Sequence, residues 1–269
     1  MRDSKDLKQI AKGYLRETYW ASLIVVTIAY FENLTHFLSN LFQVISGSRA
    51  FFFYRYRSEL SIDVFDRMPQ GRVLPTLSFN ITSLQSINWF WLLYGLIAPV
   101  LIIGCSSYFL KLLRGQDTEI KGVFDYFSLF FRAIGLSLLM SLIIGLCFFA
   151  FFFVGKILVW VFRFGQTFTL IWGIISVIPA VVVSLSYSMS FLVLADNPDL
   201  TAIEVLKESR RTMDGERSRF FVLVLSFLGW VILDAFLGGL VMFWVYPYIT
   251  ATVTAFYLDV TNPAQLSAA

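Results

Sequence analysis

Residues Trp89–Leu113 read WFWLLYGLIAPVLIIGCSSYFLKLL, an apolar run whose only charged residue is Lys111, close to its end. A run of about 18 or more such residues is long enough for a helix to cross a bilayer. The composition agrees, because 58% of the 269 residues are hydrophobic and only 14% are charged, against about a quarter charged in soluble domains. Similar runs occur at Trp20–Phe42, Phe131–Val154, Leu170–Ala195, Phe220–Leu237 and Val241–Val260.

These runs predict an all-α membrane protein, a single membrane domain with six transmembrane helices arranged as three helical hairpins. Helices are expected because the runs far exceed the roughly ten-residue alternating strands of a membrane barrel. An amphipathic stretch on the cytoplasmic side precedes each hairpin, at Lys5–Tyr19, Thr118–Phe130 and Leu200–Met213. In the third stretch Thr201 and Glu204 have the spacing of a capping box.

The basic residues predict the orientation of the chain. With the N-terminus inside, fourteen Lys and Arg lie inside and seven outside, together all 21. Cytoplasmic segments carry such an excess, so we expect both termini in the cytoplasm and residues 46–88 as an outer loop. Arg55 and Arg57 lie among aromatic residues in this loop, which is either a cap over the bundle or an element that contacts lipid. Candidate headgroup contacts are Arg55, Arg57, Lys207, Arg210 and Arg211.

A weak threefold repeat relates the inward-running helices. Each has a proline near its outer end, Pro99, Pro179 and Pro247, where it can start or kink a helix. Small or hydroxylated residues follow five and seven positions later and would let helices approach closely. Three copies of one unit would explain this pattern, and so would chance placement of prolines in apolar runs.

Polar residues within the apolar runs are candidates for function, because charges are costly at membrane depth. Glu32 and His36 are four residues apart on one helical face, and Asp234 is expected near the middle of the fifth run. Three interpretations stay open. The groups could be satisfied by other helices, could line a wet cavity that passes protons or cations, or could lie above the hydrocarbon if the first span ends early.

The chain contains no recognisable catalytic motif. We find no metalloprotease helix, nucleophile elbow or glycine-rich phosphate loop. One histidine and two cysteines, Cys105 and Cys147 in apolar runs, predict neither a metal site nor a disulfide framework. We therefore expect no enzyme activity, cofactor, metal or nucleic-acid partner.

Several segments of the second half resemble one family of bacterial membrane proteins. They include YSMSF at Tyr187–Phe191, LADNP at Leu194–Pro198, SRRTMDG at Ser209–Gly215 and WVYPY at Trp244–Tyr248. The chain is similar to the family called domain of unknown function nine-seven-five along nearly its whole length. Residues 46–88 and 156–168 look like departures from it. The resemblance implies a multi-pass protein of the cytoplasmic membrane, mostly found in Gram-positive bacteria, with no established reaction or catalytic residue.

These features favour a non-enzymatic scaffold, accessory or protective factor of the cell envelope that binds lipid headgroups or a membrane partner. One alternative is a small transporter or channel for ions, protons or lipid that uses a polar cavity. An intramembrane enzyme is a third interpretation. The aspartate of Asp196-Asn197-Pro198 belongs to a helix stop, so we expect it to be structural.

Overall fold

The computed structural model describes residues 2–32, 34–35, 37–38, 89–162, 166–237 and 239–263. Every regular element in these ranges is helical, which confirms the predicted fold class at that level. The elements are α1 (Ser4–Ala29), α4 (Trp89–Leu113), η2 (Ile120–Leu129), α5 (Phe130–Phe162), α6 (Gln166–Ser186), α7 (Ser190–Asp196), α8 (Ala202–Thr212), α9 (Arg217–Leu225), α10 (Leu228–Phe236) and α11 (Val241–Thr261).

Five helical segments in the described ranges are long and apolar enough to cross a membrane. They are Leu93–Leu113, Ile120–Val161, Ile171–Asp196, Arg217–Phe236 and Val241–Thr261. The sixth predicted span, Trp20–Phe42, lies partly outside the described residues, and the predicted outer loop 46–88 lies wholly outside them. The structure therefore supports several membrane-crossing helices but not a particular six-helix arrangement.

The three predicted amphipathic stretches correspond to different elements in the structure. Lys5–Tyr19 is not a separate helix, because α1 continues without a break from Ser4 to Ala29. Thr118–Phe130 contains the 3₁₀ helix η2, and Leu200–Met213 contains α8. In α8 the predicted capping box is present: the Thr201 hydroxyl accepts from the Glu204 N–H at 3.4 Å, and the Thr201 N–H donates to Glu204 Oε2 at 2.8 Å. The Thr201 N–H and hydroxyl both donate to the Glu204 carboxylate, and these two hydrogen bonds lower the pKa of Glu204.

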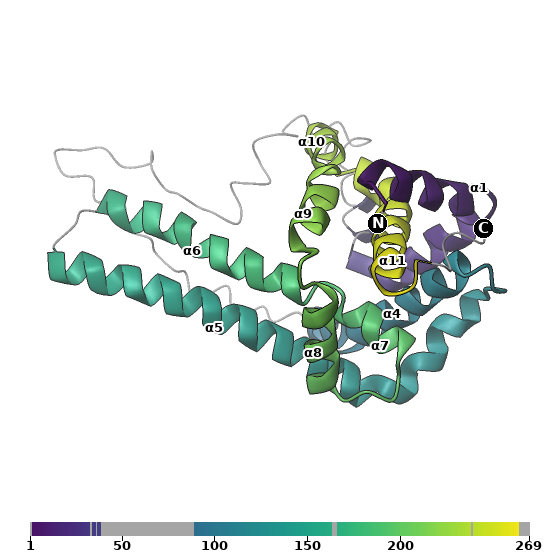
Figure 1. The fold of residues 1–269 in the computed structure, drawn as a ribbon, viewed down its shortest axis with the longest axis horizontal. Coiled ribbons are helices and arrows are strands. Elements are labelled where there is room, and N and C mark those ends of the chain that lie inside the picture. Colours follow the sequence, from purple (N-terminus) through teal and green to yellow (C-terminus); the bar gives the residue numbers. More distant parts are fainter. Residues whose placement is uncertain are drawn as a thin grey trace.

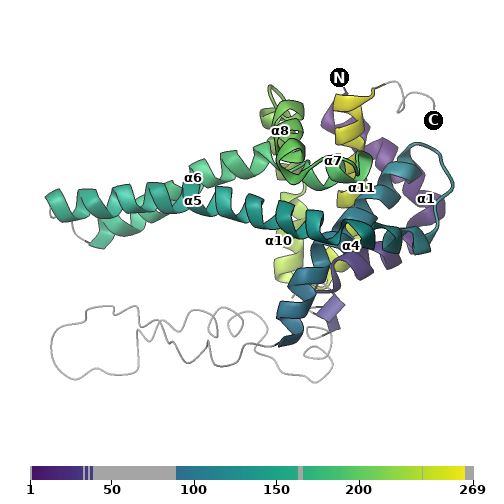
Figure 2. The ribbon, with the colours of Figure 1, turned by 90° about the horizontal axis from the view of Figure 1, so that it is seen from below.

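The molecule consists of a helical body and a projecting hairpin made by α5 and α6 (Figures 1 and 2). The hairpin helices touch closely, because a Cβ added at Gly155 would lie 1.7 Å from Trp172 Cδ1. Trp172 Nε1 also donates to the Phe151 carbonyl at 2.8 Å. In both views α9 and α10 run across the direction of this hairpin rather than along it. The outer surface of the hairpin is apolar and exposed; Trp160, for example, is 83% exposed.

Helix α4 is the centre of the body, packed against α1, η2, α5, α7 and α11. Its buried side chains include Val100, Ile103 and Phe109. At Gly104 the backbone of η2 comes so near that an added Cβ would lie 2.2 Å from the Val123 carbonyl oxygen. Only glycine fits at this contact, which holds η2 against the side of α4.

The three prolines of the predicted repeat lie inside α4, α6 and α11. Seven residues after each proline is a buried hydroxyl, on Ser106, Ser186 and Thr254. Each hydroxyl donates to the carbonyl four residues earlier, at 2.8, 3.0 and 2.9 Å respectively. The shared contact is consistent with a repeat, which nevertheless stays a prediction.

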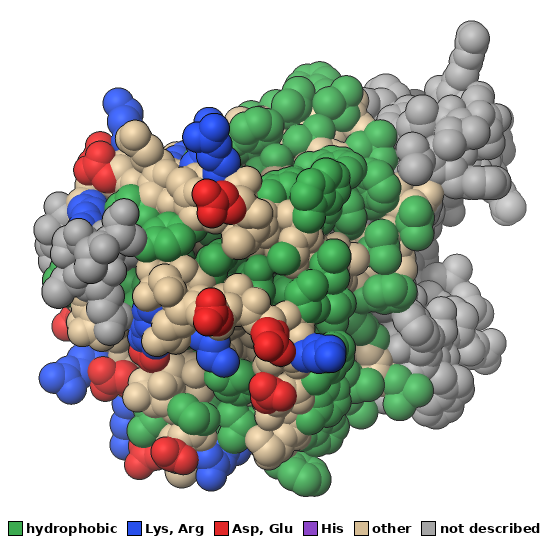
Figure 3. All heavy atoms as spheres, turned by 90° about the vertical axis from the view of Figure 1, so that its right-hand side faces the viewer, with side chains coloured by type: hydrophobic (Ala, Val, Ile, Leu, Met, Phe, Trp, Pro, Cys, Tyr) green, Lys and Arg blue, Asp and Glu red, His purple; other side chains and the backbone are tan. Residues whose placement is uncertain are grey.

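Charged side chains gather toward one side of the molecule. In Figure 3 they lie at the left of the face shown, and apolar side chains cover most of the described surface to the right. Arg2 and the end of α11 meet within this charged end, since the Arg2 N–H donates to Asp259 Oδ2 at 3.2 Å. The N-terminal end of α1 and the C-terminal end of α11 are therefore on the same side of the body.

Candidate functional site

The most distinctive concavity is a groove between α1 and the pair α10–α11, which we call the aromatic–basic groove. It has a volume of about 700 Å³, within the usual range for small-molecule sites. Its wall combines apolar and aromatic side chains with two cations. The lining residues are Lys12, Leu15, Arg16, Tyr19, Trp230, Trp244, Val245 and Tyr248.

The groove exists because α1 runs antiparallel to α11 along most of its length. Arg2 lies at Asp259 near the end of α11, and Tyr19 donates its hydroxyl to the Trp244 carbonyl at 2.9 Å near the start. Between them, Lys8 Nζ donates to the Ser226 carbonyl at 3.3 Å and lies 4.4 Å from the centre of the Phe227 ring. Desolvation by burial lowers the pKa of Lys8.

The two cations of the groove have the spacing of one helical turn. Lys12 and Arg16 therefore lie on one face of α1, next to the buried Leu15. Both side chains are exposed, and within the described part of the chain neither forms an ion pair. This end of the groove thus presents two available positive charges beside an apolar wall.

The turn between α10 and α11 holds the opposite wall in place. The carboxylate of Asp234 accepts from the Met242 N–H at 2.7 Å, in the first turn of α11. Gly239 has φ +84° and donates its N–H to the Asp234 carbonyl at 2.8 Å. Asp234 therefore caps α11 and fixes the start of the helix that carries Trp244.

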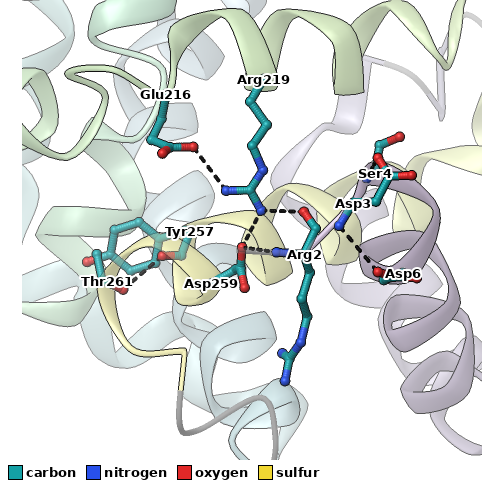
Figure 4. Close-up of polar contacts among 9 residues, drawn as sticks. All are labelled: Arg2, Asp3, Ser4, Asp6, Glu216, Arg219, Tyr257, Asp259 and Thr261. Carbon is teal, nitrogen blue, oxygen red and sulfur yellow. Dashed lines mark hydrogen bonds and ion pairs between the residues drawn. The ribbon is translucent and has the colours of Figure 1, made fainter.

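An ionic cluster fixes the charged end of the same helices (Figure 4). Arg219 reaches from α9 to the carboxylate of Asp259 on α11 and also donates to the Arg2 carbonyl at 2.6 Å. Its second nitrogen pairs with Glu216 at 2.9 Å. Asp259 is nearly fully buried, so these donors replace the water that its carboxylate would otherwise contact.

A second cluster joins α4, α7 and α11. Arg114 Nη2 lies 2.7 Å from Asp196 Oδ1, and the Tyr257 hydroxyl donates to Asp196 Oδ2 at 3.2 Å. Helix α7 ends at Asp196, as the motif Asp196-Asn197-Pro198 predicts. Arg132 adds a hydrogen bond to the carbonyl of Pro198. Asp196 thus ends α7 and ties it to α4 and α11, in line with the helix stop expected from the sequence.

The predicted polar cavity involves Glu32, His36 and Asp234, which lie only partly within the described residues, so it stays a prediction. Asp234 lies at the end of α10 rather than in the middle of a span, and its carboxylate is already engaged as a cap. Glu32 is exposed and lies near the same end of α11, since the Phe37 ring stacks on Phe243 at 4.6 Å. His36 lies outside the described residues, so whether it meets Glu32 stays a prediction.

The predicted headgroup contacts are only partly described. Lys207, Arg210 and Arg211 are all exposed on α8, and Arg211 lies 3.8 Å from Glu208. Arg55 and Arg57 lie outside the described residues. Among the described residues, no group of three or more His, Cys, Asp or Glu could hold a metal ion.

Sequence reasoning did not select Lys12, Arg16, Trp230 or Trp244 as site residues. Lys8, Lys12 and Arg16 recur every four residues, which was the available signal for one cationic face. The tryptophans of the groove come from α10 and α11, at the other end of the chain. No local feature of the sequence indicates that these helices pack beside α1.

Comparison with known proteins identifies the family but not an activity. No curated protein and no solved structure matches the chain. A family profile described as "Protein of unknown function (DUF975)" matches residues 1–264, a range that includes both segments expected to depart from the family. The match spans nearly the whole chain, and the protein therefore belongs to the DUF975 family of proteins of unknown function.

Proposed function

We propose that this protein is a non-enzymatic, multi-pass protein of the bacterial cytoplasmic membrane that acts by binding a membrane lipid in the aromatic–basic groove. The single observation that carries the proposal is the groove itself, with two cations at one end and Trp230, Trp244 and Tyr248 along its wall. Amphiphiles match such a surface, because their charged and apolar parts need different partners. We therefore propose a lipid-binding accessory or protective role in the envelope.

The lipid is expected to remain with the protein through purification. We would purify the wild type in mild detergent and measure retained lipid by native mass spectrometry. A Trp230→Ala/Trp244→Ala variant removes most of the aromatic wall and should retain several-fold less lipid. Trp160→Ala is the matched control, because Trp160 is an exposed tryptophan on α5, outside the groove. Equal loss in both variants, or no lipid on the wild type, would contradict the proposal.

The proposed topology has six spans and both termini in the cytoplasm; because Tyr19 lies beside Trp244 at the outer start of α11 and Arg2 beside Asp259 at its inner end, the first span in this topology is α1 rather than Trp20–Phe42. The topology is supported by the five described apolar segments and by the bond between Arg2 and Asp259, which brings the two ends of the chain together. In the structure the α5–α6 hairpin runs across α9 and α10. For all of these helices to span the bilayer, the hairpin would have to reorient at its junctions with η2 and α7. Helix α5, at about 50 Å, is longer than the hydrocarbon layer of about 30 Å, so it would also tilt.

A single cysteine tests this topology. A cysteine replacing Val161, which is exposed near the tip of the hairpin, would be introduced into a chain whose two native cysteines are replaced. In intact cells an impermeant thiol reagent should label it from outside. Labelling only after the membrane is opened would refute a hairpin that spans the bilayer with its tip outside.

One observation also favours a second function, movement of lipid across the membrane. Lys8, Lys12 and Arg16 form a row along α11, a candidate span, rather than a cluster beyond its end. A row of cations at that position could guide an anionic headgroup through the apolar layer. Proteoliposomes with fluorescent lipid in both leaflets test this idea with a membrane-impermeant reductant. If the reductant bleaches only the outer leaflet, as in protein-free vesicles, transport is excluded.

A further inference from the structure

We infer that the ligand of the aromatic–basic groove is an anionic phospholipid of the surrounding bilayer, with its phosphate held by Lys12 and Arg16. The inference rests on the proposed function and adds the chemical class of the ligand. It follows from the charges that line the groove, from their lack of ion-pair partners among the described residues, and from the apolar wall beside them.

Among the described residues, the lining has two positive charges and no acidic side chain. Glu17 is adjacent to Arg16 in sequence, but it is exposed and does not line the groove. An Arg guanidinium and a Lys ammonium one turn apart can together bind the oxygens of one phosphate. A net negative headgroup would therefore be complementary to this end of the groove, whereas a zwitterionic headgroup would leave its own cation without a carboxylate partner.

The rest of the groove fits the apolar part of the same molecule. Leu15 and Val245 are buried at its base, and Trp230 and Trp244 remain 41% and 43% exposed in its wall. Indole rings are favoured where apolar chains meet polar headgroups. A small anion such as free phosphate would leave this apolar surface unused, so the bilayer is the source that accounts for both ends.

The site is held open by contacts that do not involve the two cations. Tyr19 bonds to the Trp244 backbone, Lys8 to the Ser226 backbone, and Arg2 to Asp259. The groove is therefore preformed, and binding need not reorganise α1 against α11. For the same reason, neutral replacements of Lys12 and Arg16 should leave the fold intact.

The test compares two lipids with identical acyl chains, phosphatidylglycerol and phosphatidylcholine, added to delipidated protein and counted by native mass spectrometry. The wild type should prefer phosphatidylglycerol by about tenfold or more, since two basic groups act on the anionic headgroup. Salt should weaken this preference. Lys12→Gln/Arg16→Gln should bind the two lipids equally while retaining the wild-type helical content.

The matched control is Lys5→Gln/Lys121→Gln, which removes the same charge from exposed positions outside the groove. It should keep the wild-type preference. Equal loss of preference in the control would assign the effect to net charge and overturn the inference. Equal binding of both lipids by the wild type would overturn the headgroup assignment and leave lipid binding intact, whereas binding of neither lipid would remove the proposed function as well.

Discussion

The ionic cluster at the charged end predicts unequal effects for its two central residues. Arg219 serves two carboxylates, Glu216 and Asp259, and also the Arg2 carbonyl. Arg219→Ala would leave both carboxylates without their guanidinium, and Asp259 is nearly fully buried. Asp259→Ala would leave Arg219 still paired with Glu216. The arginine variant should therefore be the less stable of the two.

The size of the difference follows from burial. Removing one partner of a buried ion pair costs about 3–5 kcal/mol, because the remaining charge is left uncompensated. We expect about 3 kcal/mol for Arg219→Ala, the low end, because the Arg219 side chain retains 22% exposure. For Asp259→Ala we expect about 1–2 kcal/mol, the loss of charge-assisted hydrogen bonds from Arg219 and the Arg2 N–H. The double variant should cost less than the sum, since no unpaired Asp259 remains.

Reversible unfolding in mixed micelles, followed by circular dichroism as the fraction of dodecyl sulfate rises, would measure these free energies. All variants should be prepared in the same detergent and lipid so that only the protein differs. An Asp259→Ala variant less stable than Arg219→Ala would refute the reasoning. Strict additivity in the double variant would also refute it, because it would mean that the two side chains do not interact.

Two pairs of substitutions test local contacts. Asp234→Ala should destabilise the protein by about 1 kcal/mol through loss of the Met242 cap, whereas Asp234→Asn retains an acceptor and should cost much less; equal costs in the unfolding assay would argue against a capping role. Gly104→Ala should destabilise it by about 1–3 kcal/mol, because the new methyl group would meet the Val123 backbone. Gly95→Ala in the same helix meets nothing within 4 Å and should be neutral or stabilising, so similar losses at both glycines would contradict the packing argument.

Local signals in the sequence predicted some helices well and others poorly. Helix α5 continues to Phe162, beyond the predicted end at Val154, and the predicted run Phe220–Leu237 is divided into α9 and α10. Helix α4 has the bounds expected from its apolar run, Trp89–Leu113, and α11 ends within a residue of its prediction. The capping box at Thr201 was readable because both residues lie within one turn. Helix α7 likewise ends at Asp196, where local hydrogen-bonding residues precede a proline. Each of the correctly predicted features depends on neighbours in the chain.

The groove could not be predicted in this way, because its walls are distant in sequence. Lys12 lines the groove together with residues more than 200 positions away in the sequence. The residues near Lys12 give no indication that α11 will lie beside α1. The same dependence on distant parts of the chain explains why Asp234 was expected in the middle of a span. Counting residues from Phe220 placed it in mid-span, but the break between α9 and α10 and the turn after Phe236 bring its carboxylate to the start of α11.

The position of Lys8, Lys12 and Arg16 along α11 also limits what the groove can contain. A Lys or Arg surrounded by hydrocarbon costs about 2.5–3.5 kcal/mol even when the side chain can adjust, so Lys12 and Arg16 together would cost about 5–7 kcal/mol. Lys8 avoids this cost through the Ser226 carbonyl and the Phe227 ring, whereas Lys12 and Arg16 have no such partner among the described residues. If α11 crosses the bilayer, acyl chains alone therefore cannot fill the groove. The end beside Arg16 must hold water or an anionic group, and only the anionic group also neutralises the two charges.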